Sequence, residues 1–265
     1  MKENLWQHVL TVRKKSPLVQ NITNYVVMNN TANALLAIGA SPIMAHAQPE
    51  VKQMIGICQS LVINIGTLDE YWVDAMLSAS AEANKLGKPW VLDPVGAGAT
   101  PYRDETLEKL VALRPPFIRG NASEIVALAK RNTTQTKGVD STLQSEEAVM
   151  AASLLHEQYG STVCISGETD IIIGEGKQIH MSNGDALMTK VTGLGCSATA
   201  IIGAFIAVIE DKVEAVAAAT ALMSIAGELA ANNASGPGSL QVQLLDKLYN
   251  ISEEEFLGKI KLTVR

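Results

Sequence analysis

The sequence is poor in cysteine and in aromatic residues. Among its 265 residues there are 3 cysteines, and the aromatic fraction is 4%. Cys58, Cys164 and Cys196 are too few and too far apart in the chain for a disulfide scaffold or a cysteine-rich zinc site. We therefore expect a reduced, cytoplasmic protein. Because 47% of the residues are apolar and few are aromatic, the core must consist mainly of Ala, Val, Ile and Leu.

Positive charge is also scarce. Lysine and arginine number 21 against 27 aspartates and glutamates, which gives a net charge of −6. This balance disfavours a nucleic-acid partner, although backbone N–H groups can still bind a small phosphate ligand. The first residues lack the apolar core of a signal peptide, and the apolar run at 198–209 is too short to cross a bilayer. We expect neither an export signal nor a membrane partner.

Short apolar segments alternate with helical ones along the chain. The expected strands are 18–22, 42–45, 61–65, 90–92, 117–118, 162–165 and 171–173. The expected helices are 3–15, 26–38, 70–86, 104–113, 123–130, 146–159, 196–209, 213–230 and 239–249. This alternation predicts an α/β fold with a mainly parallel sheet covered by helices on both faces. No Pro- or Ser-rich linker interrupts it, so one domain over residues 1–265 is expected.

The most distinctive local motif is Thr-Gly-Leu-Gly-Cys at residues 192–196, directly before an apolar helix. Glycines at a helix start let the backbone approach a ligand, and the free N–H groups and the helix dipole favour an anion. No Gly-Lys-Ser/Thr follows, so the motif is not a Walker A loop. The alternative is a simple glycine-rich helix start with a buried cysteine.

Three other polar segments follow expected strands. Asp-Pro-Val-Gly-Ala-Gly at 93–98 offers a carboxylate at a strand end, or forms only a turn. Arg-Gly-Asn-Ala-Ser-Glu at 119–124 offers a phosphate-binding arginine and a carboxylate for Mg²⁺, but its spacing also fits a helix capping box. Ile-Ser-Gly-Glu-Thr-Asp at 165–170 lines a nucleotide or forms a hairpin turn. Jointly the segments indicate a magnesium-dependent phosphoryl-transfer site.

The same segments belong to a set of blocks that resembles hydroxyethylthiazole kinase, a family of the ribokinase-like superfamily. The matching blocks lie at 16–19, 21–24, 31–33, 39–42, 64–67, 93–98, 119–124, 138–140, 167–168, 190–196 and 236–239. They span nearly the whole chain in collinear order. The resemblance implies a ribokinase-like three-layer sandwich that phosphorylates the hydroxyl of 5-(2-hydroxyethyl)-4-methylthiazole with ATP and Mg²⁺, in thiamine salvage. It also implies a homotrimer with active sites between subunits.

The resemblance also implies roles for single residues. Met44 would contact the thiazole, and the backbone of Gly193 would lie at the substrate hydroxyl. Asn24 and Gly66 are further candidates near the substrate.

On the nucleotide side, Arg119 and Ser166 would bind ATP, while Asp93 and Glu124 would organise the magnesium ion. Cys196 stands where many superfamily members have an aspartate general base, as is usual for the thiazole kinase branch. A helix N-terminus favours its thiolate and a buried apolar site opposes it, so Cys196 either deprotonates the alcohol weakly or chiefly positions it.

Other functions remain open at this point. One is a kinase of another small heterocyclic alcohol, such as hydroxymethylpyrimidine. Another is a thiazole or nucleotide sensor that binds without turnover. A third alternative is the activity of a superfamily relative, an ATP-dependent dehydratase of hydrated nicotinamide nucleotides. This activity is disfavoured because its anion hole requires an acidic residue where this chain has Cys196.

Overall fold

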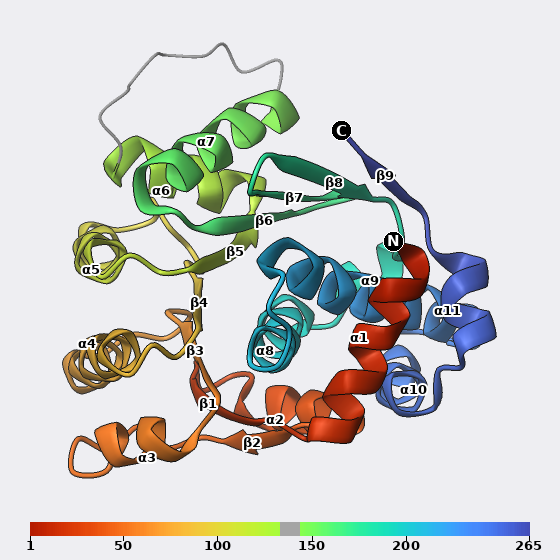
Figure 1. The fold of residues 1–265 in the computed structure, drawn as a ribbon, viewed down its shortest axis with the longest axis horizontal. Coiled ribbons are helices and arrows are strands. Elements are labelled where there is room, and N and C mark those ends of the chain that lie inside the picture. Colours follow the sequence, from red (N-terminus) through yellow and green to blue (C-terminus); the bar gives the residue numbers. More distant parts are fainter. Residues whose placement is uncertain (133–143) are drawn as a thin grey trace.

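The computed structural model describes residues 1–132 and 144–265, so the sequence block at 138–140 lies outside the described residues (Figure 1). The strands are β1 (Leu18–Ile22), β2 (Ser41–Ile43), β3 (Ser60–Asn64), β4 (Trp90–Asp93), β5 (Phe117–Asn121), β6 (Thr162–Ser166), β7 (Asp170–Gly174), β8 (Lys177–Met181) and β9 (Leu262–Val264).

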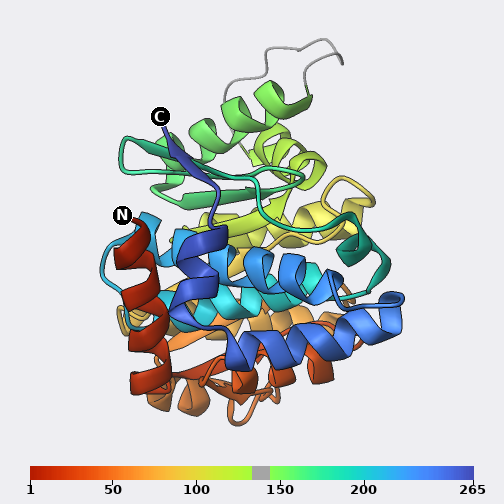
Figure 2. The same ribbon diagram turned by 90° about the vertical axis from the view of Figure 1, so that its right-hand side faces the viewer.

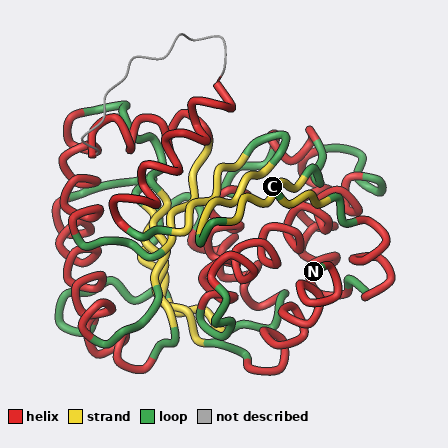
Figure 3. The backbone as a smooth tube through the Cα atoms, turned by 45° about the horizontal axis from the view of Figure 1, so that its top comes forward, coloured by secondary structure: helices red, strands yellow, loops and turns green. Residues whose placement is uncertain are grey.

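These strands form one sheet in the order β2-β1-β3-β4-β5-β6-β7-β8-β9. The strands from β2 to β6 pair in parallel, and β7, β8 and β9 extend the sheet with antiparallel pairs. Figure 3 shows the strands of this sheet in yellow, with helices on both sides. The expected mainly parallel sheet is therefore confirmed. The hairpin alternative for residues 165–170 is also confirmed, because β6 and β7 pair directly through that turn.

Helices cover both faces of the sheet (Figure 1). One face carries α3 (Val51–Ile57), α4 (Glu70–Lys85), α5 (Pro101–Ala112), α6 (Ala122–Asn132) and α7 (Gln144–Tyr159). The other carries α1 (Lys2–Lys15), α2 (Met28–Ala37), α8 (Leu194–Ile206), α9 (Lys212–Ala231), α10 (Pro237–Asn250) and α11 (Glu253–Lys259). Here α8 and α9 contact the strands, while α1 (red) and α10 (blue) pack over them, as Figure 2 shows.

The core consists of two apolar clusters, one on each face of the sheet. Residues alternate between the clusters along each strand, so Val62 of β3 faces α8 while Leu61 and Ile63 face α4. Gly203 lets α8 approach the sheet closely, because a Cβ there would lie 2.5 Å from Val62 Cγ2. The apolar helix α9 passes a length and composition test for a membrane span, yet it is a buried core helix here.

Several elements differ from expectation. The helix after residues 192–196 begins at Leu194, two residues early, because Gly193 (φ 81°) already serves as its N-cap. Four elements were not expected at all: α3, β8, β9 and the 3₁₀ helix Ala186–Lys190. They are short, and the periodicity of seven residues or fewer is a weak signal.

The sheet brings polar strand ends together on its α8 face. Val62 pairs with Val91 on this face, so Asn64 and Asp93, two residues further on, pair with each other above them. Arg119 of β5 pairs with Cys164 of β6 on the same face. In the sheet, β2 lies on one side of β1 and β3 lies on its other side, so the strand order reverses between β1 and β3. Ligands of open α/β sheets bind at such a switch point.

Candidate active site

The N-terminus of α8 forms one wall of the site. Gly193 adopts a left-handed conformation (φ 81°), and a Cβ there would lie 2.6 Å from Val27 Cγ1, so only glycine fits. The first backbone N–H groups of α8 have no partner within the helix. The Arg119 guanidinium lies beside them, since a Cβ on Gly195 would be 3.0 Å from Arg119 Nη1. Helix N–H groups and an arginine together form a site for an anion.

Asp93 is the buried carboxylate of the site, with 1% of its surface exposed. Its Oδ2 accepts hydrogen bonds from Asn64 Nδ2 and Thr199 Oγ1, both at 2.7 Å. Burial raises the pKa of Asp93 to about 6, although Arg119 and the Thr199 hydroxyl oppose the shift. The negative charge of Glu124 raises this pKa further, so the two carboxylates lie close enough for their charges to interact.

A chain of hydrogen bonds links Asp93 to Cys196. Asn24 Nδ2 donates to Asn64 Oδ1 at 2.7 Å and contacts Cys196 Sγ at 3.5 Å. Backbone donors fix both amides, since Val26 N donates to Asn24 Oδ1 and Gly66 N donates to Asn64 Oδ1. With both amide oxygens occupied in this way, Asn24 Nδ2 faces Asn64 and the sulfur, and Asn64 Nδ2 faces the Asp93 carboxylate.

Cys196 is a protonated thiol at neutral pH. Burial raises its pKa to about 11, and the Asp93 carboxylate adds to the shift. The hydrogen bonds of Asn64 and Asn24, and the charge of Arg119, oppose it. Of the two influences weighed from the sequence, burial is the one that dominates this pKa.

Glu124 holds two loops together. Its Oε2 accepts from Asn121 N at 2.8 Å, and Asn121 Oδ1 accepts from Glu124 N at 2.9 Å, so the capping-box alternative is confirmed. Its Oε1 accepts from Gly96 N at 3.0 Å, in the loop after Asp93. A carboxylate oxygen has lone pairs to spare after one such bond, so the cap does not prevent Glu124 from accepting a water of a hydrated cation.

A magnesium ion fits this pair of carboxylates. Within residues 1–132 and 144–265 no group of three His, Cys, Asp or Glu side chains converges as a metal site. Mg²⁺ does not require one, because it keeps several waters and binds through one or two carboxylates plus substrate phosphates. Asp93 and Glu124 supply that donor set.

Arg103 of α5 joins the loops that follow β3 and β4. Its Nη1 donates to Ile65 O at 2.6 Å and Val95 O at 2.8 Å, and its Nη2 donates to Gly66 O at 2.8 Å. The first loop carries Gly66 and the second follows Asp93. One side chain therefore sets the spacing of both loops.

A pocket of about 770 Å³ adjoins the N-terminus of α8. Arg119, Ser166 and Asp170 line it together with the segment 182–189 and residues of α8 and α9. Burial disfavours the charged guanidinium, but Asp93, then Cys164 and Asp170, raise the pKa of Arg119. Burial also raises the pKa of Asp170. The volume lies within the usual 300–1,000 Å³ range of cofactor sites.

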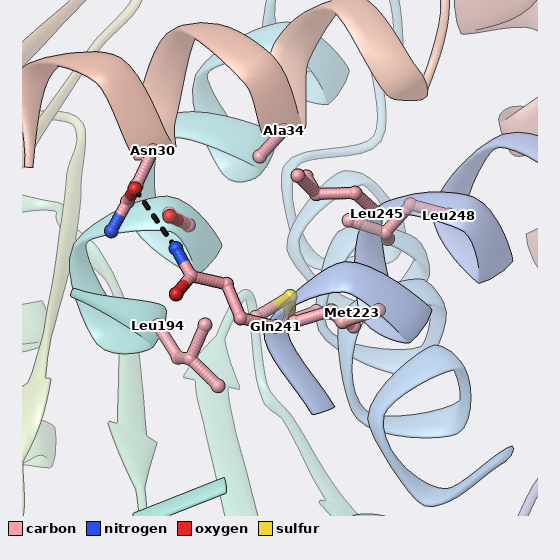
Figure 4. Close-up of a pocket in the computed structure, with 9 residues that line it drawn as sticks. Asn30, Ala34, Leu194, Met223, Gln241, Leu245 and Leu248 are labelled. Atoms are coloured by element: carbon pink, nitrogen blue, oxygen red, sulfur yellow. Dashed lines mark hydrogen bonds between the residues drawn. The ribbon is translucent and has the colours of Figure 1, made fainter. Parts of the chain in front are cut away.

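A second pocket, of about 20 Å³, lies between α2, α8 and α10 (Figure 4). Asn30 Oδ1 accepts from Gln241 Nε2 at 3.1 Å across it, and Leu194 lies on the other side of Gln241 from Asn30 in this view. The space suffices for about one water and not for a substrate.

Met44 lies further from the other predicted residues. It follows β2, which β1 separates from β3, and Gln20 Nε2 fixes the next residue by donating to Ala45 O at 2.9 Å. The structure thus brings Asp93, Arg119, Glu124, Ser166, Gly193 and Cys196 around the α8 N-terminus and leaves Met44 at the end of the same sheet edge.

Sequence reasoning gave no role to Asn64, Thr199 or Arg103. Thr199 follows Cys196 by three residues on a helix, a spacing that places both on one face. Asn64 ends β3 as Asp93 ends β4, which is a usable signal. Nothing local marks Arg103, because its partners are backbone carbonyls of two other segments.

Comparison with solved structures supports the fold. A hydroxyethylthiazole kinase protein from Pyrococcus horikoshii OT3 superposes with a TM-score of 0.92 at 40% identity, covering 99% of both chains. A pyridoxal kinase from Staphylococcus aureus in complex with AMP-PCP and pyridoxal gives 0.65 at 15% identity, covering 94% of this chain and 98% of that one. At that identity the second match shows the ribokinase-like fold alone.

Comparison of sequences identifies the family. A hydroxyethylthiazole kinase from Syntrophus aciditrophicus is 56% identical over 261 residues, covering 98% of this chain and 97% of its own. One from Vibrio campbellii is 51% identical over 263 residues, covering 99% and 98%. The model of the hydroxyethylthiazole kinase family matches residues 9–254. The chain therefore belongs to the hydroxyethylthiazole kinase family.

Proposed function

We propose that the protein transfers the γ-phosphoryl group of ATP to the hydroxyl of 5-(2-hydroxyethyl)-4-methylthiazole. The product is 4-methyl-5-(2-phosphooxyethyl)thiazole, and the reaction belongs to thiamine salvage. Relatives of this name at 56% and 51% identity support the substrate. The observation that carries the chemistry is the position of Arg119 and Asp93 at the open N-terminus of α8, beside a large pocket.

ATP occupies the pocket of about 770 Å³ in this proposal. Arg119 and the α8 N–H groups bind the phosphates, and Ser166 at the end of β6 contacts the nucleotide. The Staphylococcus aureus pyridoxal kinase, which binds AMP-PCP, shares the fold and supports this assignment.

Asp93 and Glu124 organise Mg²⁺. The bound ion would neutralise the developing charge on the phosphate oxygens. Asn64 and Thr199 hold one oxygen of Asp93 and leave the other for a ligand. Asn121 and Gly96 hold Glu124 in place by their N–H groups.

Cys196 positions the acceptor hydroxyl. With a pKa of about 11, its thiol is too weak an acid to supply a thiolate base at neutral pH. Phosphoryl transfer depends mainly on positioning and charge stabilisation, so a strong base is not required. The backbone of Gly193 lies at the same hydroxyl, and Met44 contacts the thiazole ring.

The chain forms a single ribokinase-like domain over residues 1–265 and acts in the cytoplasm as a homotrimer, with active sites between subunits. Exposed apolar side chains beside the site support the assembly, because Tyr25 and Val26 directly follow Asn24 and are 58% and 61% exposed. Light scattering on the eluting protein measures the assembly mass, and a monomer would contradict this part of the proposal.

The test is ADP release by the purified protein with ATP and Mg²⁺, with and without the thiazole alcohol. We expect strong stimulation by the thiazole and a phosphorylated product detected by mass spectrometry. Asp93→Ala should lose magnesium-dependent turnover while it still binds thiazole. A folded protein that binds ATP but phosphorylates only hydroxymethylpyrimidine, or binds thiazole without turnover, would overturn the proposal.

A further inference from the structure

The large pocket is unevenly charged. Among the described residues that line it, Arg119 is the only cation, while Glu168, Asp170 and Asp185 are carboxylates. A triphosphate carries several negative charges, so three carboxylates do not fit the phosphate end of a nucleotide. They fit a part of the ligand that donates hydrogen bonds.

The strand order arranges these residues along the pocket. Arg119 lies on β5, Ser166 ends β6, Asp170 begins β7, and Ser182 follows β8. Neighbouring strands lie about 4.8 Å apart, so Asp170 is about 10 Å from the strand of Arg119. A nucleotide with its phosphates at Arg119 and α8 extends its nucleoside across β6 and β7 toward the segment 182–189.

Asp170 differs from the other two carboxylates. Glu168 and Asp185 are exposed, and Asp185 already caps the short 3₁₀ helix Ala186–Lys190 by accepting from Leu187 N at 2.7 Å. Asp170 is 9% exposed and pinned at both oxygens, by Gly167 N and Ser224 Oγ, each at 3.1 Å.

This geometry leaves Asp170 able to accept further hydrogen bonds. An ionised carboxylate has about four acceptor positions, and the two bonds to Gly167 and Ser224 use two of them. The side chain faces α9 on the same side of the sheet as Arg119, since Ile172 on the same strand packs into the cluster that holds α8 and α9. A fixed, largely buried acceptor thus lines the pocket.

We propose that Asp170 accepts hydrogen bonds from the ribose hydroxyls of the bound nucleotide and so makes the enzyme select ribonucleotides. The inference rests on the proposed use of ATP. Hydroxyl-to-carboxylate bonds are charge-assisted and short, and acidic residues bind ribose hydroxyls in dinucleotide folds for the same reason. Phosphates stay with Arg119, away from this carboxylate.

The test compares ATP with 2′-deoxyATP and 3′-deoxyATP on wild-type protein and on Asp170→Asn. Wild type should lose about tenfold or more in kcat/KM with at least one deoxynucleotide, mainly through KM, because the lost bond is charge-assisted. Asp170→Asn should lose most kcat/KM with ATP itself. The ratio of kcat/KM for ATP to that for the deoxynucleotide should therefore fall toward one. Glu168→Gln is the matched control, since it removes an exposed carboxylate of the same pocket, leaves Asp170 and its two hydrogen bonds in place, and should retain the preference.

Binding separates this inference from the proposed activity. Displacement of a fluorescent ATP analogue labelled on the base reports the same preference without any thiazole, so it holds even if the acceptor is another alcohol. Equal use of all three nucleotides by wild type overturns the inference, and so does an equal loss for all three in Asp170→Asn. Tighter ATP binding by Asp170→Asn with an unchanged preference would show that the carboxylate only repels phosphate.

Discussion

Replacing Gly66 with alanine tests whether Asn24 must lie where the structure places it. The backbone of Gly66 is not in the left-handed region, so an alanine at this position introduces no backbone strain. Its Cβ, however, would lie 2.5 Å from Asn24 Nδ2 and 2.8 Å from Asn24 Cγ. Optimal heavy-atom contacts are about 3.5 Å, so Asn24 must move by about 1 Å.

That shift breaks the hydrogen-bond chain of the site. The 2.7 Å bond from Asn24 to Asn64 and the 3.5 Å contact with Cys196 both lengthen beyond hydrogen-bond distance. Overpacking costs about 1–3 kcal/mol, and a buried amide left without its partner costs about as much again. We expect Gly66→Ala to lose between about 2 and 6 kcal/mol of unfolding free energy, and about 10²-fold in kcat.

Urea unfolding and steady-state kinetics measure the two effects. Gly56→Ala is the matched control, because no atom lies within 4 Å of a Cβ at that helical position, and it should be neutral or slightly stabilising. A Cβ on Gly66 would also lie 2.9 Å from Asn24 Cβ, so the background that removes the whole clash is Asn24→Gly, and in it most of the unfolding cost of Gly66→Ala should disappear. Wild-type behaviour of Gly66→Ala, or an equal cost in both backgrounds, would refute the reasoning.

Three other substitutions or reactions test the site and its support. Thr199→Val should cost about 1.5–3 kcal/mol of stability above the Asp93 pKa of about 6 and less below it, because the lost bond serves the ionised carboxylate; a pH-independent cost in urea titrations would contradict this. Alkylation of Cys196 by iodoacetamide should accelerate about tenfold per pH unit until the pH approaches its pKa of about 11; a rate that levels off near neutral pH, followed by mass spectrometry, would count against a protonated thiol. Gly203→Ala should lower the unfolding free energy by about 1–3 kcal/mol, since its Cβ would lie 2.5 Å from Val62 Cγ2; an unchanged urea midpoint would disprove this close packing.

The fold was largely predictable because its signals are local. Buried parallel strands such as β3 and β4 are continuous apolar runs that end abruptly in a polar residue. That abrupt end also marks Asp93, so its place at the sheet edge followed from the sequence. The antiparallel strand β8 was missed because its residues Lys177–Met181 alternate polar and apolar over too short a length.

The site was less predictable where it depends on long-range contacts. Asn24 and Asn64 are 40 positions apart in the sequence, and no local sequence pattern indicates that their side-chain amides bond to each other. The pKa of Cys196 was undecided for the same reason, since its burial depends on the whole packed site. Tertiary packing, and not propensity, decides such contacts.

The three carbonyl bonds of Arg103 also constrain how the site moves. They join the loops after β3 and β4, so these two loops cannot separate to admit a ligand without breaking either the bond to Val95 O or the two bonds to Ile65 O and Gly66 O. Most of the segment 182–190 lines the large pocket, Arg103 does not join this segment to the two loops, and several of its residues are exposed. We therefore expect ligands to enter and leave on the nucleotide side of the site. Amide hydrogen exchange in the segment 182–190 should then be faster than in the loops that Arg103 joins.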